Sequence, residues 1–313
     1  MVQSKGTSIG ASSGSSGGGW RATESRTAWL LSAPALIALA AFIVVPFALA
    51  VGLSFTNQRL ISPLPTRFVG VENYLATLGE PAFWRGFTNN ITFVAVVVPV
   101  QSALALLLAI LVNGKVRGRV VFRTVYFLPV VTVMAAAAVT WTLLLNPNGL
   151  VNAVVGVISL GSAGPDWLGS TTWALPAVMI VSIWQGTGFQ MIILLAALQD
   201  VPEELYEAAE LDGAGAWARF VNVTVPGIRN GLIFVVTVTT ILAFRLFDQV
   251  WIMPQAPGGP LDSTRTMMLH LVETGFGQQA IGRASAVAVI FFVLVLVLTI
   301  VQRRFIREEG GDR

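Results

Sequence analysis

The sequence predicts an all-α polytopic membrane protein with six transmembrane helices, and three observations support that fold class. Of its 313 residues, 55% are hydrophobic and only 11% are charged, and the mean hydropathy is +0.75. Because a soluble domain carries about 25% charged residues, lipid must take the place of the missing charged surface. The chain also contains six apolar segments of spanning length, and the connections between them are too short to hold a soluble domain.

Each predicted span has about 20 mostly apolar residues, the length that crosses a bilayer as an α-helix. Several contain proline or glycine, which spans tolerate when neighbouring helices bond the freed backbone groups. The six segments are Ala28 to Phe55, Ile91 to Asn113, Phe122 to Leu145, Trp173 to Leu198, Gly231 to Met253 and Ala284 to Val301. We therefore expect one membrane domain over residues 28–313, preceded by a disordered Ser- and Gly-rich tail over residues 1–27.

The distribution of lysine and arginine predicts the orientation of the chain. Six crossings place both termini on the same side of the membrane. With a cytoplasmic N-terminus, thirteen lysines and arginines lie inside and five lie outside, as the positive-inside rule requires. We expect a protein of the bacterial cytoplasmic membrane with both termini, and the connection 199–228, in the cytoplasm.

Polar residues near the outer ends of the spans are expected at the membrane surface. Asn89 and Asn90 directly precede the second predicted span, and asparagine is a favoured helix cap. His270 lies in an amphipathic outer segment, where a role at the membrane interface is favoured over a role as a ligand.

The connection 199–228 contains the most informative polar segment of the chain. Pro202 and the two glutamates after it favour a helix start, because proline suits the first turn and carboxylates there complement the helix dipole. Gly213 is typical of a helix end, and a second short helix would then run to Pro226. Such an acidic, amphipathic elbow could enter a groove on a partner protein, although a solvated loop with no partner is the alternative.

Polar residues inside the fourth predicted span indicate a candidate path through the membrane, because such residues are costly in lipid and tend to face a cavity. Gln185 and Gln190 could hydrogen-bond hydroxyl groups, and the ring of Phe189 could lie against an apolar face of a bound molecule. The glycines between them, Gly186 and Gly188, are slightly better explained by helix packing.

The fifth predicted span adds three candidate residues. Arg245 and Asp248 are three residues apart and could pair on one helix face, either as a structural clamp or as part of an outer vestibule. Thr240 lies deeper and either faces the path or bonds back to its own helix.

The acidic connection resembles the coupling motif of binding-protein-dependent ABC importers, although the usual Ile-x-Leu-Pro ending is Val-x-Val-Pro here. The matching residues are Glu207, Ala208, Ala209, Gly213, Val223, Val225 and Pro226. Four further segments, in the right order, resemble the carbohydrate subgroup of the maltose and glycerol-phosphate type. They are Phe68 to Tyr74, Phe127 to Pro129, Phe247-Asp248 with Gly258-Gly259-Pro260, and Gly282 to Ala286.

The resemblance implies a six-span permease of the type I importer class, which is a transport subunit and not an enzyme. Its cytoplasmic loop would sit in a cleft of a nucleotide-binding ATPase dimer. The coupling residues would be Glu207, Ala208, Ala209, Asp212, Gly213 and Pro226. A second permease subunit and an extracytoplasmic substrate-binding protein or lipoprotein complete the expected assembly. ATP and magnesium would bind the partner ATPase, and this chain, which has no phosphate-binding loop motif, would hold no cofactor.

An uncharged sugar or oligosaccharide is the expected substrate, because Asp248 is expected to neutralise Arg245, the one arginine that lies away from the ends of a predicted span. Glycerol phosphate or a glycerophosphodiester is the alternative within the same machinery. An ion-coupled secondary carrier is disfavoured, because it needs buried carboxylates or histidines and only Asp248 qualifies. A single histidine and no cysteine leave no catalytic or metal cluster, and topology explains the basic balance without a nucleic-acid partner.

Overall fold

The computed structural model describes residues 29, 31–61, 65–114, 118–160 and 164–308. The expected disordered tail, residues 1–27, lies outside this part of the chain. The described residues form helices and loops, with one isolated β-bridge between Thr56 and Phe68. The chain forms two compact units, Met1–Ala50 and Val51–Arg313.

The first unit contains most of an apolar helical run, Leu31–Ser54, whose mean hydropathy is 2.7. Within it a π-helical turn, η1 (Ala40–Val44), precedes α2 (Val45–Ser54). The amide of Val45 donates to the Ala40 carbonyl, and Pro46 follows with no amide hydrogen to continue the regular pattern. The proline therefore accounts for the widened turn.

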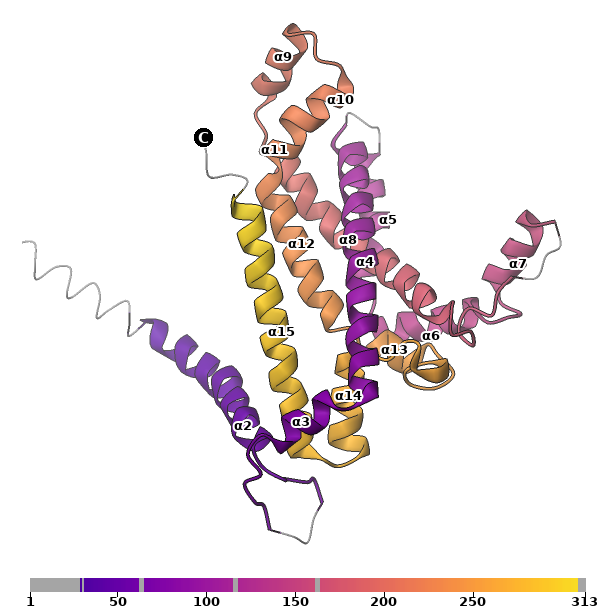
Figure 1. Ribbon diagram of the computed structural model, residues 1–313. Helices are drawn as coiled ribbons and strands as arrows, with labels where there is room; N and C mark the ends of the chain where they lie inside the picture. The colour runs from indigo at the N-terminus through magenta and orange to yellow at the C-terminus, as the bar shows by residue number, and fades with distance from the viewer. Residues whose placement is uncertain (1–28, 30, 62–64, 115–117, 161–163, 309–313) are drawn as a thin grey trace, which may run out of the picture. The chain divides into compact units, whose positions relative to one another are not determined.

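In the second unit, α8 (Ala174–Gln199) is the central helix (Figure 1). It packs along most of α4 (Pro81–Asn113) and also against α5 (Arg119–Val131) and α12 (Arg229–Phe244). The helix α15 (Ile281–Glu308) packs on the other side of α12. Polar groups on α8 therefore lie among three other helices, α4, α5 and α12.

Two buried apolar clusters hold these helices together. One joins α4 and α8 to the segments around α12, and its fully buried members include Phe93, Val97, Val178, Val181, Val250 and Leu269. The second contains Ala105, Ala109, Met191, Leu194, Ile228 and Val235. Small residues such as Ala105 and Ala109 allow the backbones of α4 and α8 to approach closely, which is how helices associate in membranes.

Five helical segments are long and apolar enough to cross a membrane, and a bent pair raises the number to six if it forms one span. The all-α polytopic prediction is therefore confirmed. The third predicted segment, however, is not one straight helix, because α5 and α6 (Met134–Leu144) meet at 97°. Four β-branched residues in succession, residues 130–133, disfavour helix there. The hydroxyl of Thr132 also ends α5 by donating to the Pro129 carbonyl at 2.6 Å.

The second predicted span also differs from expectation, because α4 begins at Pro81 and not near Ile91. Proline is favoured in the first helical turn, and the helix continues without interruption through Asn89 and Asn90. The prediction that these asparagines cap the span is therefore wrong. Both lie inside α4 and bond to other segments.

The two ends of the second unit carry different short elements (Figure 1). At one end lie α9 (Glu203–Leu211), α10 (Ala216–Arg219), η2 (Phe220–Thr224) and α11 (Val225–Gly227). Toward the other end lie α3 (Glu72–Leu78), η3 (Pro260–Asp262), α14 (Met267–Val272) and η4 (Glu273–Gly277). Near that end, α13 (Asp248–Ile252) follows a break after α12, and α7 (Leu150–Ile158) lies in the connection after α6.

Candidate functional site

A cavity of about 630 Å³ lies between α4, α5, α6, α8 and the break that separates α12 from α13. Its size falls in the usual range for small-molecule sites, about 300–1,000 Å³. Aromatic rings and polar side chains share its wall, among them Phe93, Gln101, Ser182, Phe247 and Gln249. Such a mixture could hold a polar molecule that also has apolar faces.

Five of the six predicted path residues line this cavity: Gln185, Phe189, Gln190, Arg245 and Asp248. The amide of Gln185 donates to the Thr132 carbonyl at 3.1 Å, at the bend between α5 and α6. The amide of Gln190 donates to the Thr239 hydroxyl on α12. The side-chain oxygen of Gln190 is buried and has no hydrogen-bond partner among the described residues.

The sixth predicted residue, Thr240, does not line the cavity. Its hydroxyl donates to the Val236 carbonyl at 2.8 Å, so it bonds back to its own helix. It also accepts a hydrogen bond from the amide of Gln302 at 2.9 Å, which joins α12 to α15. We therefore leave Thr240 out of the candidate path.

Arg245 and Asp248 do not form the pair expected from their spacing. The helix α12 ends at Phe244 and α13 begins at Asp248, so the two residues do not share a helix face. Neither forms an ion pair with any described residue. Both side chains are exposed and line the cavity, which leaves one positive and one negative group on its wall.

The glycines on α8 are points of close helix approach. A side chain at Gly188 would overlap the Tyr126 carbonyl of α5, and one at Gly186 would overlap the amide end of Gln101 on α4. The glycines thus set the packing of α8, and Gly186 also lines the cavity together with the glutamines beside it.

The acidic connection forms the expected helix–glycine–helix elbow. Gly213 has φ of 76°, in the left-handed region that glycine adopts without strain. Its amide donates to the Glu210 carbonyl at 3.0 Å, and the Ala214 amide donates to the Ala209 carbonyl at 2.9 Å. These two bonds form a Schellman motif, which satisfies the last carbonyls of α9.

Further contacts tie the two arms of the elbow together. The hydroxyls of Tyr206 and Thr224 are 3.1 Å apart, and Arg219 pairs with Glu210 at 2.9 Å. An exposed ion pair of this kind contributes about 0–1 kcal/mol. The second arm contains η2, in which Val225 donates to Phe220 just before Pro226, so a proline again follows a π-helical turn.

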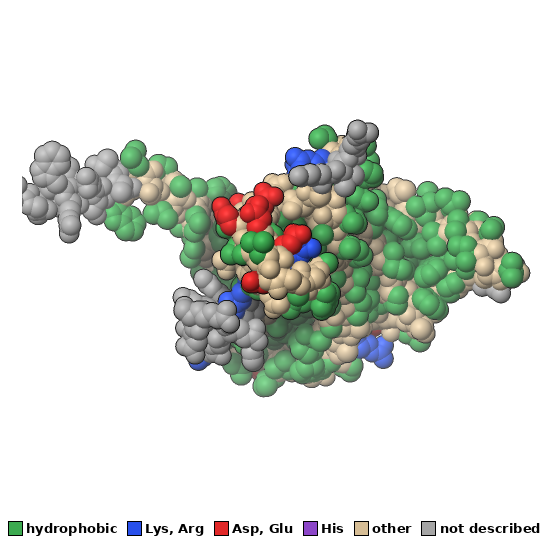
Figure 2. Space-filling view, turned by 90° about the horizontal axis from the view of Figure 1, so that it is seen from above, with side chains coloured by type: hydrophobic (Ala, Val, Ile, Leu, Met, Phe, Trp, Pro, Cys, Tyr) green, Lys and Arg blue, Asp and Glu red, His purple; other side chains and the backbone are tan. Residues whose placement is uncertain are grey.

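The coupling residues named from the sequence lie on the surface of this elbow. Glu207, Ala208, Asp212, Gly213 and Pro226 are exposed, and Ala209 is half-buried. Figure 2, which looks onto this end, shows acidic side chains gathered together. Those of Glu203, Glu204 and Glu207 form no ion pair with any described residue, so this surface has negative charge available for a basic partner.

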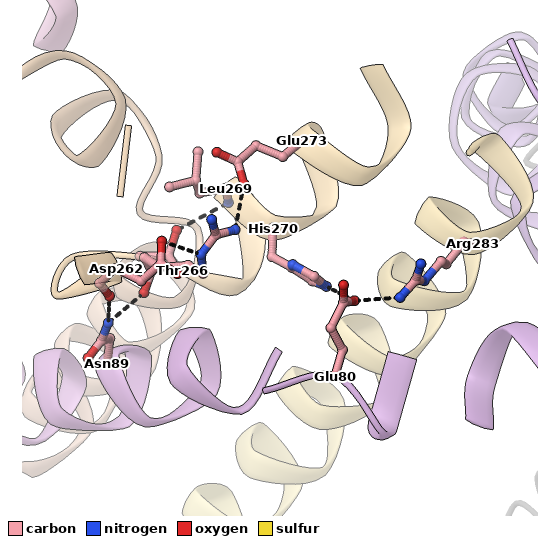
Figure 3. Close-up of polar contacts among 9 residues, drawn as sticks. Glu80, Asn89, Asp262, Thr266, Leu269, His270, Glu273 and Arg283 are labelled. Atoms are coloured by element: carbon pink, nitrogen blue, oxygen red, sulfur yellow. Dashed lines mark hydrogen bonds and ion pairs between the residues drawn. The ribbon is translucent and has the colours of Figure 1, made fainter. Parts of the chain in front are cut away.

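A second polar cluster lies at the opposite end (Figure 3). Glu80 pairs with Arg283 at 2.7 Å, and its carboxylate oxygen lies 3.4 Å from Nε2 of His270. His270 is only 2% exposed, so its expected place at the membrane interface is wrong. Burial lowers the pKa of His270 below its usual 6.5, against the opposing effect of Glu80. Among the described residues no group of three or more histidines and acids is placed to hold a metal.

Comparison with known proteins identifies the class to which this helical membrane subunit belongs. Residues 73–308 match the family described as binding-protein-dependent transport system inner membrane component. The chain belongs to this family. It is therefore a multi-pass permease of the inner, cytoplasmic membrane, part of an ABC transporter complex that depends on a binding protein. The prediction that it is a transport subunit and not an enzyme is confirmed.

Relatives match along most of their length. The lactose transport system permease protein LacF of Rhizobium radiobacter is 32% identical over 283 residues, covering 90% of this chain and 94% of the relative. The trehalose/maltose transport system permease protein MalF of Thermococcus litoralis is 34% identical over 281 residues, covering 89% and 92%. The sulfoquinovosyl glycerol transport system permease protein SmoG of Agrobacterium fabrum is 34% identical over 281 residues, covering 90% of each.

A solved structure shares the fold. A chain of a bacterial alginate ABC transporter, in complex with a periplasmic protein bound to an alginate pentasaccharide, matches with a TM-score of 0.79 at 20% identity. The match covers 92% of this chain and 98% of that one.

Proposed function

We propose that this permease imports a sugar or oligosaccharide, delivered by its extracytoplasmic binding protein, with energy from a separate ATPase dimer. The observation that carries the proposal is the cavity at the broken helix, whose lining includes both amides and aromatic rings. Sugars present hydroxyl groups at their edges and apolar C–H faces, and they match both kinds of group. The names of the relatives that act on lactose and on trehalose or maltose agree with this substrate class.

Gln190 is the residue best suited to bind a sugar hydroxyl. Its buried side-chain oxygen accepts no hydrogen bond from the described residues, and an unsatisfied buried acceptor costs about 1–3 kcal/mol. A ligand hydroxyl that donated to this oxygen would remove the cost. Phe189, one residue earlier on α8, also lines the cavity and would lie against the ring of the sugar.

The elbow over residues 199–228 would transmit the action of the ATPase. With both termini cytoplasmic, as the positive-inside rule predicts, the acidic surface of α9 would face a basic cleft of the ATPase, with Glu207 at its centre. The elbow continues directly into both α8 and the segment leading to α12, the helices that carry Gln190 and the break at Arg245. A nucleotide that favours one arrangement of the ATPase dimer would thereby shift the permease between an inward-facing and an outward-facing arrangement of the cavity.

An anionic substrate, such as a glycerol phosphate or a glycerophosphodiester, is the second candidate. A specific observation favours it, because Arg245 lines the cavity without an ion pair to any described residue. The sequence-based reason for excluding anions, neutralisation by Asp248, is therefore lost. Asp248 itself lines the same cavity, so the wall carries no net charge from this pair, and we retain the neutral sugar as the leading proposal.

Affinity purification of the full chain in mild detergent, followed by mass spectrometry, tests the assembly. We expect an ATPase, a second six-span permease and a substrate-binding protein or lipoprotein to co-purify. The thermal stability of that binding protein would then be measured with lactose, maltose, trehalose and glycerol 3-phosphate. Stabilisation by a sugar supports the leading proposal, and stabilisation by glycerol 3-phosphate alone replaces it with the second. Purification of this chain without an ATPase would contradict the coupling proposal.

A further inference from the structure

The break between α12 and α13 exposes backbone groups inside the membrane domain, and a small set of side chains bonds to them. The last carbonyls of a helix have no partner within that helix, and at membrane depth water is not there to satisfy them. Here the carbonyls of Phe244 and Leu246, on either side of Arg245, accept hydrogen bonds from outside the helix.

Asn90 of α4 supplies one of these bonds and a second one beside it. It is fully buried, its amide donates to the Phe244 carbonyl at 3.3 Å, and its side-chain oxygen accepts from the Met267 amide at 2.8 Å. One side chain thus joins the end of α12 to the start of α14. Both partners are distant in sequence, at separations of 154 and 177 residues.

Thr266 supplies the other bond. Its hydroxyl donates to the Leu246 carbonyl at 3.0 Å and accepts from the Leu269 amide at 3.2 Å, which makes it the N-cap of α14 (Figure 3). Asn90 and Thr266 therefore bond to the carbonyls on the two sides of Arg245. Asn90 also accepts a hydrogen bond from Met267, the residue that follows Thr266.

Two more residues of α4 complete the contact. A side chain at Gly86, one turn before Asn90, would meet the Thr266 carbonyl carbon at 3.0 Å and the Met267 nitrogen at 3.1 Å, so glycine permits the close approach. Asn89 donates to the carbonyls of Asp262 and Arg265 at 3.1 and 2.9 Å (Figure 3). The outer end of α4 is thus fitted to the loop that leads into α14.

We infer that Asn90, with Gly86 beside it, is a positioning residue that fixes the α12–α13 break and so places Arg245 and Asp248 on the cavity wall. Asn90 does not itself line the cavity, and it acts through the backbone of Phe244. The role of these two side chains in transport rests on the function proposed above, whereas their placement does not.

Because the chain has no cysteine, single cysteines can report on this placement without a substrate. Arg245→Cys would be introduced into the full chain, and the rate at which this cysteine reacts with a methanethiosulfonate reagent would be measured on the purified chain in mild detergent. Phe189→Cys reports on the part of the cavity wall formed by α8, and Leu211→Cys reports on the exposed elbow. Each cysteine is compared in the wild-type, Asn90→Ala and Gly86→Ala backgrounds.

We expect both variants to change the reaction rate at position 245 by about three- to tenfold, because residue 245 would no longer be held in place on the cavity wall. Asn90→Ala removes both hydrogen bonds of the side chain, and the methyl group of Gly86→Ala would press on the backbone of Thr266 and Met267. The rates at positions 189 and 211 should not change. Thr92→Ala is the matched control, because within the described part of the chain its hydroxyl bonds only to the Thr88 carbonyl of the same helix, and it should change no rate.

An unchanged rate at position 245 in both variant backgrounds would overturn the inference. An equal change at all three positions would also overturn it, because a general effect on the protein is not positioning. Gly86→Ala keeps every hydrogen-bonding group, so it decides the question if Asn90→Ala does not fold. Since labelling requires neither substrate nor ATP, failure here is separate from failure of the transport proposal.

Discussion

At the scale of single residues, Gly213 shows how a local backbone requirement supports the coupling surface. Its φ of 76° places it in the left-handed region, and the Schellman bonds at the end of α9 depend on that conformation. Another residue there costs about 1–2 kcal/mol, even though a side chain would meet no atom within 4 Å.

We therefore predict that Gly213→Ala weakens the recovery of the ATPase with this chain. Gly213→Asn should retain more of it, because asparagine tolerates the left-handed region. Gly215→Ala is the matched control, since Gly215 is also open on all sides but has a negative φ of −67°. Quantifying the co-purified ATPase for each variant checks the prediction, and equal losses from both alanine variants would contradict it.

Gln190 links the cavity to a second helix, and its loss should affect substrate handling. We expect Gln190→Ala to raise the KM for uptake by about three- to tenfold, because a neutral hydrogen bond is worth about 0.5–1.5 kcal/mol. Uptake would be measured in vesicles together with the binding protein. Thr240→Val is the control, because Thr240 is buried next to Thr239, the partner of Gln190 on α12, but lies outside the cavity. An unchanged KM for Gln190→Ala would remove it from the path.

His270 should make stability depend on pH. Its pKa is lowered in the folded state, so at acid pH the unfolded state binds the proton more readily than the folded state. The contribution of neutral His270 to the free energy of unfolding is therefore fully present above the ordinary pKa of about 6.5. It is lost as the pH falls through the lower pKa of the folded state. Thermal unfolding of the wild type between pH 7.5 and 5 should show this loss, and His270→Gln should reduce it. Equal slopes for both proteins would contradict the prediction.

Two glutamines chosen from the sequence line the cavity, whereas the contacts of Asn90 with distant segments were not foreseen. Gln185 and Gln190 stand out because polar side chains in an apolar segment need a partner or a cavity. Asn90 is likewise a polar residue beside an apolar segment, but its hydrogen-bond partners lie 154 and 177 residues away in the sequence. No local pattern reveals such partners, so its proximity to the segment's end suggested a cap instead.

At the scale of elements, helix existence followed from hydrophobic length, whereas the breaks did not. The third and fifth predicted segments are long and apolar enough to cross a membrane, yet each is interrupted, at residues 132–133 and 245–247. The breaks depend on side chains elsewhere that satisfy the freed carbonyls, such as Gln185 at Thr132 and Asn90 at Phe244. Both breaks border the cavity, so the irregular backbone lies where a site needs it.

Packing of α8 against α5 should be sensitive to any side chain at Gly188. We predict that Gly188→Ala lowers the free energy of unfolding by about 1–3 kcal/mol, the usual effect of overpacking, because the new methyl group would overlap the Tyr126 carbonyl. Gly186→Ala should cost less, since its methyl group meets only the flexible end of Gln101. Thermal unfolding in detergent ranks the two variants, and the reverse order would contradict this view of the packing.

At the scale of the whole molecule, the family assignment and the described helices agree on a multi-pass inner-membrane permease. Within the second unit, the acidic elbow lies at one end and the α4–α14 contact toward the other (Figure 1). The helices α8 and α12 run between these regions and border the cavity. This arrangement supports the central claim that a conformational change driven by a partner ATPase at the elbow is transmitted to the cavity through α8 and α12.

Uptake by the purified complex in proteoliposomes tests that claim most directly. The ligand of the co-purified binding protein would be followed with ATP inside the vesicles, and separately with an imposed proton or sodium gradient and no ATP. We predict accumulation that requires both ATP and the binding protein, and that is lost in Glu207→Ala although this variant still inserts in the membrane. Accumulation driven by an ion gradient without ATP would contradict the account and establish a secondary carrier.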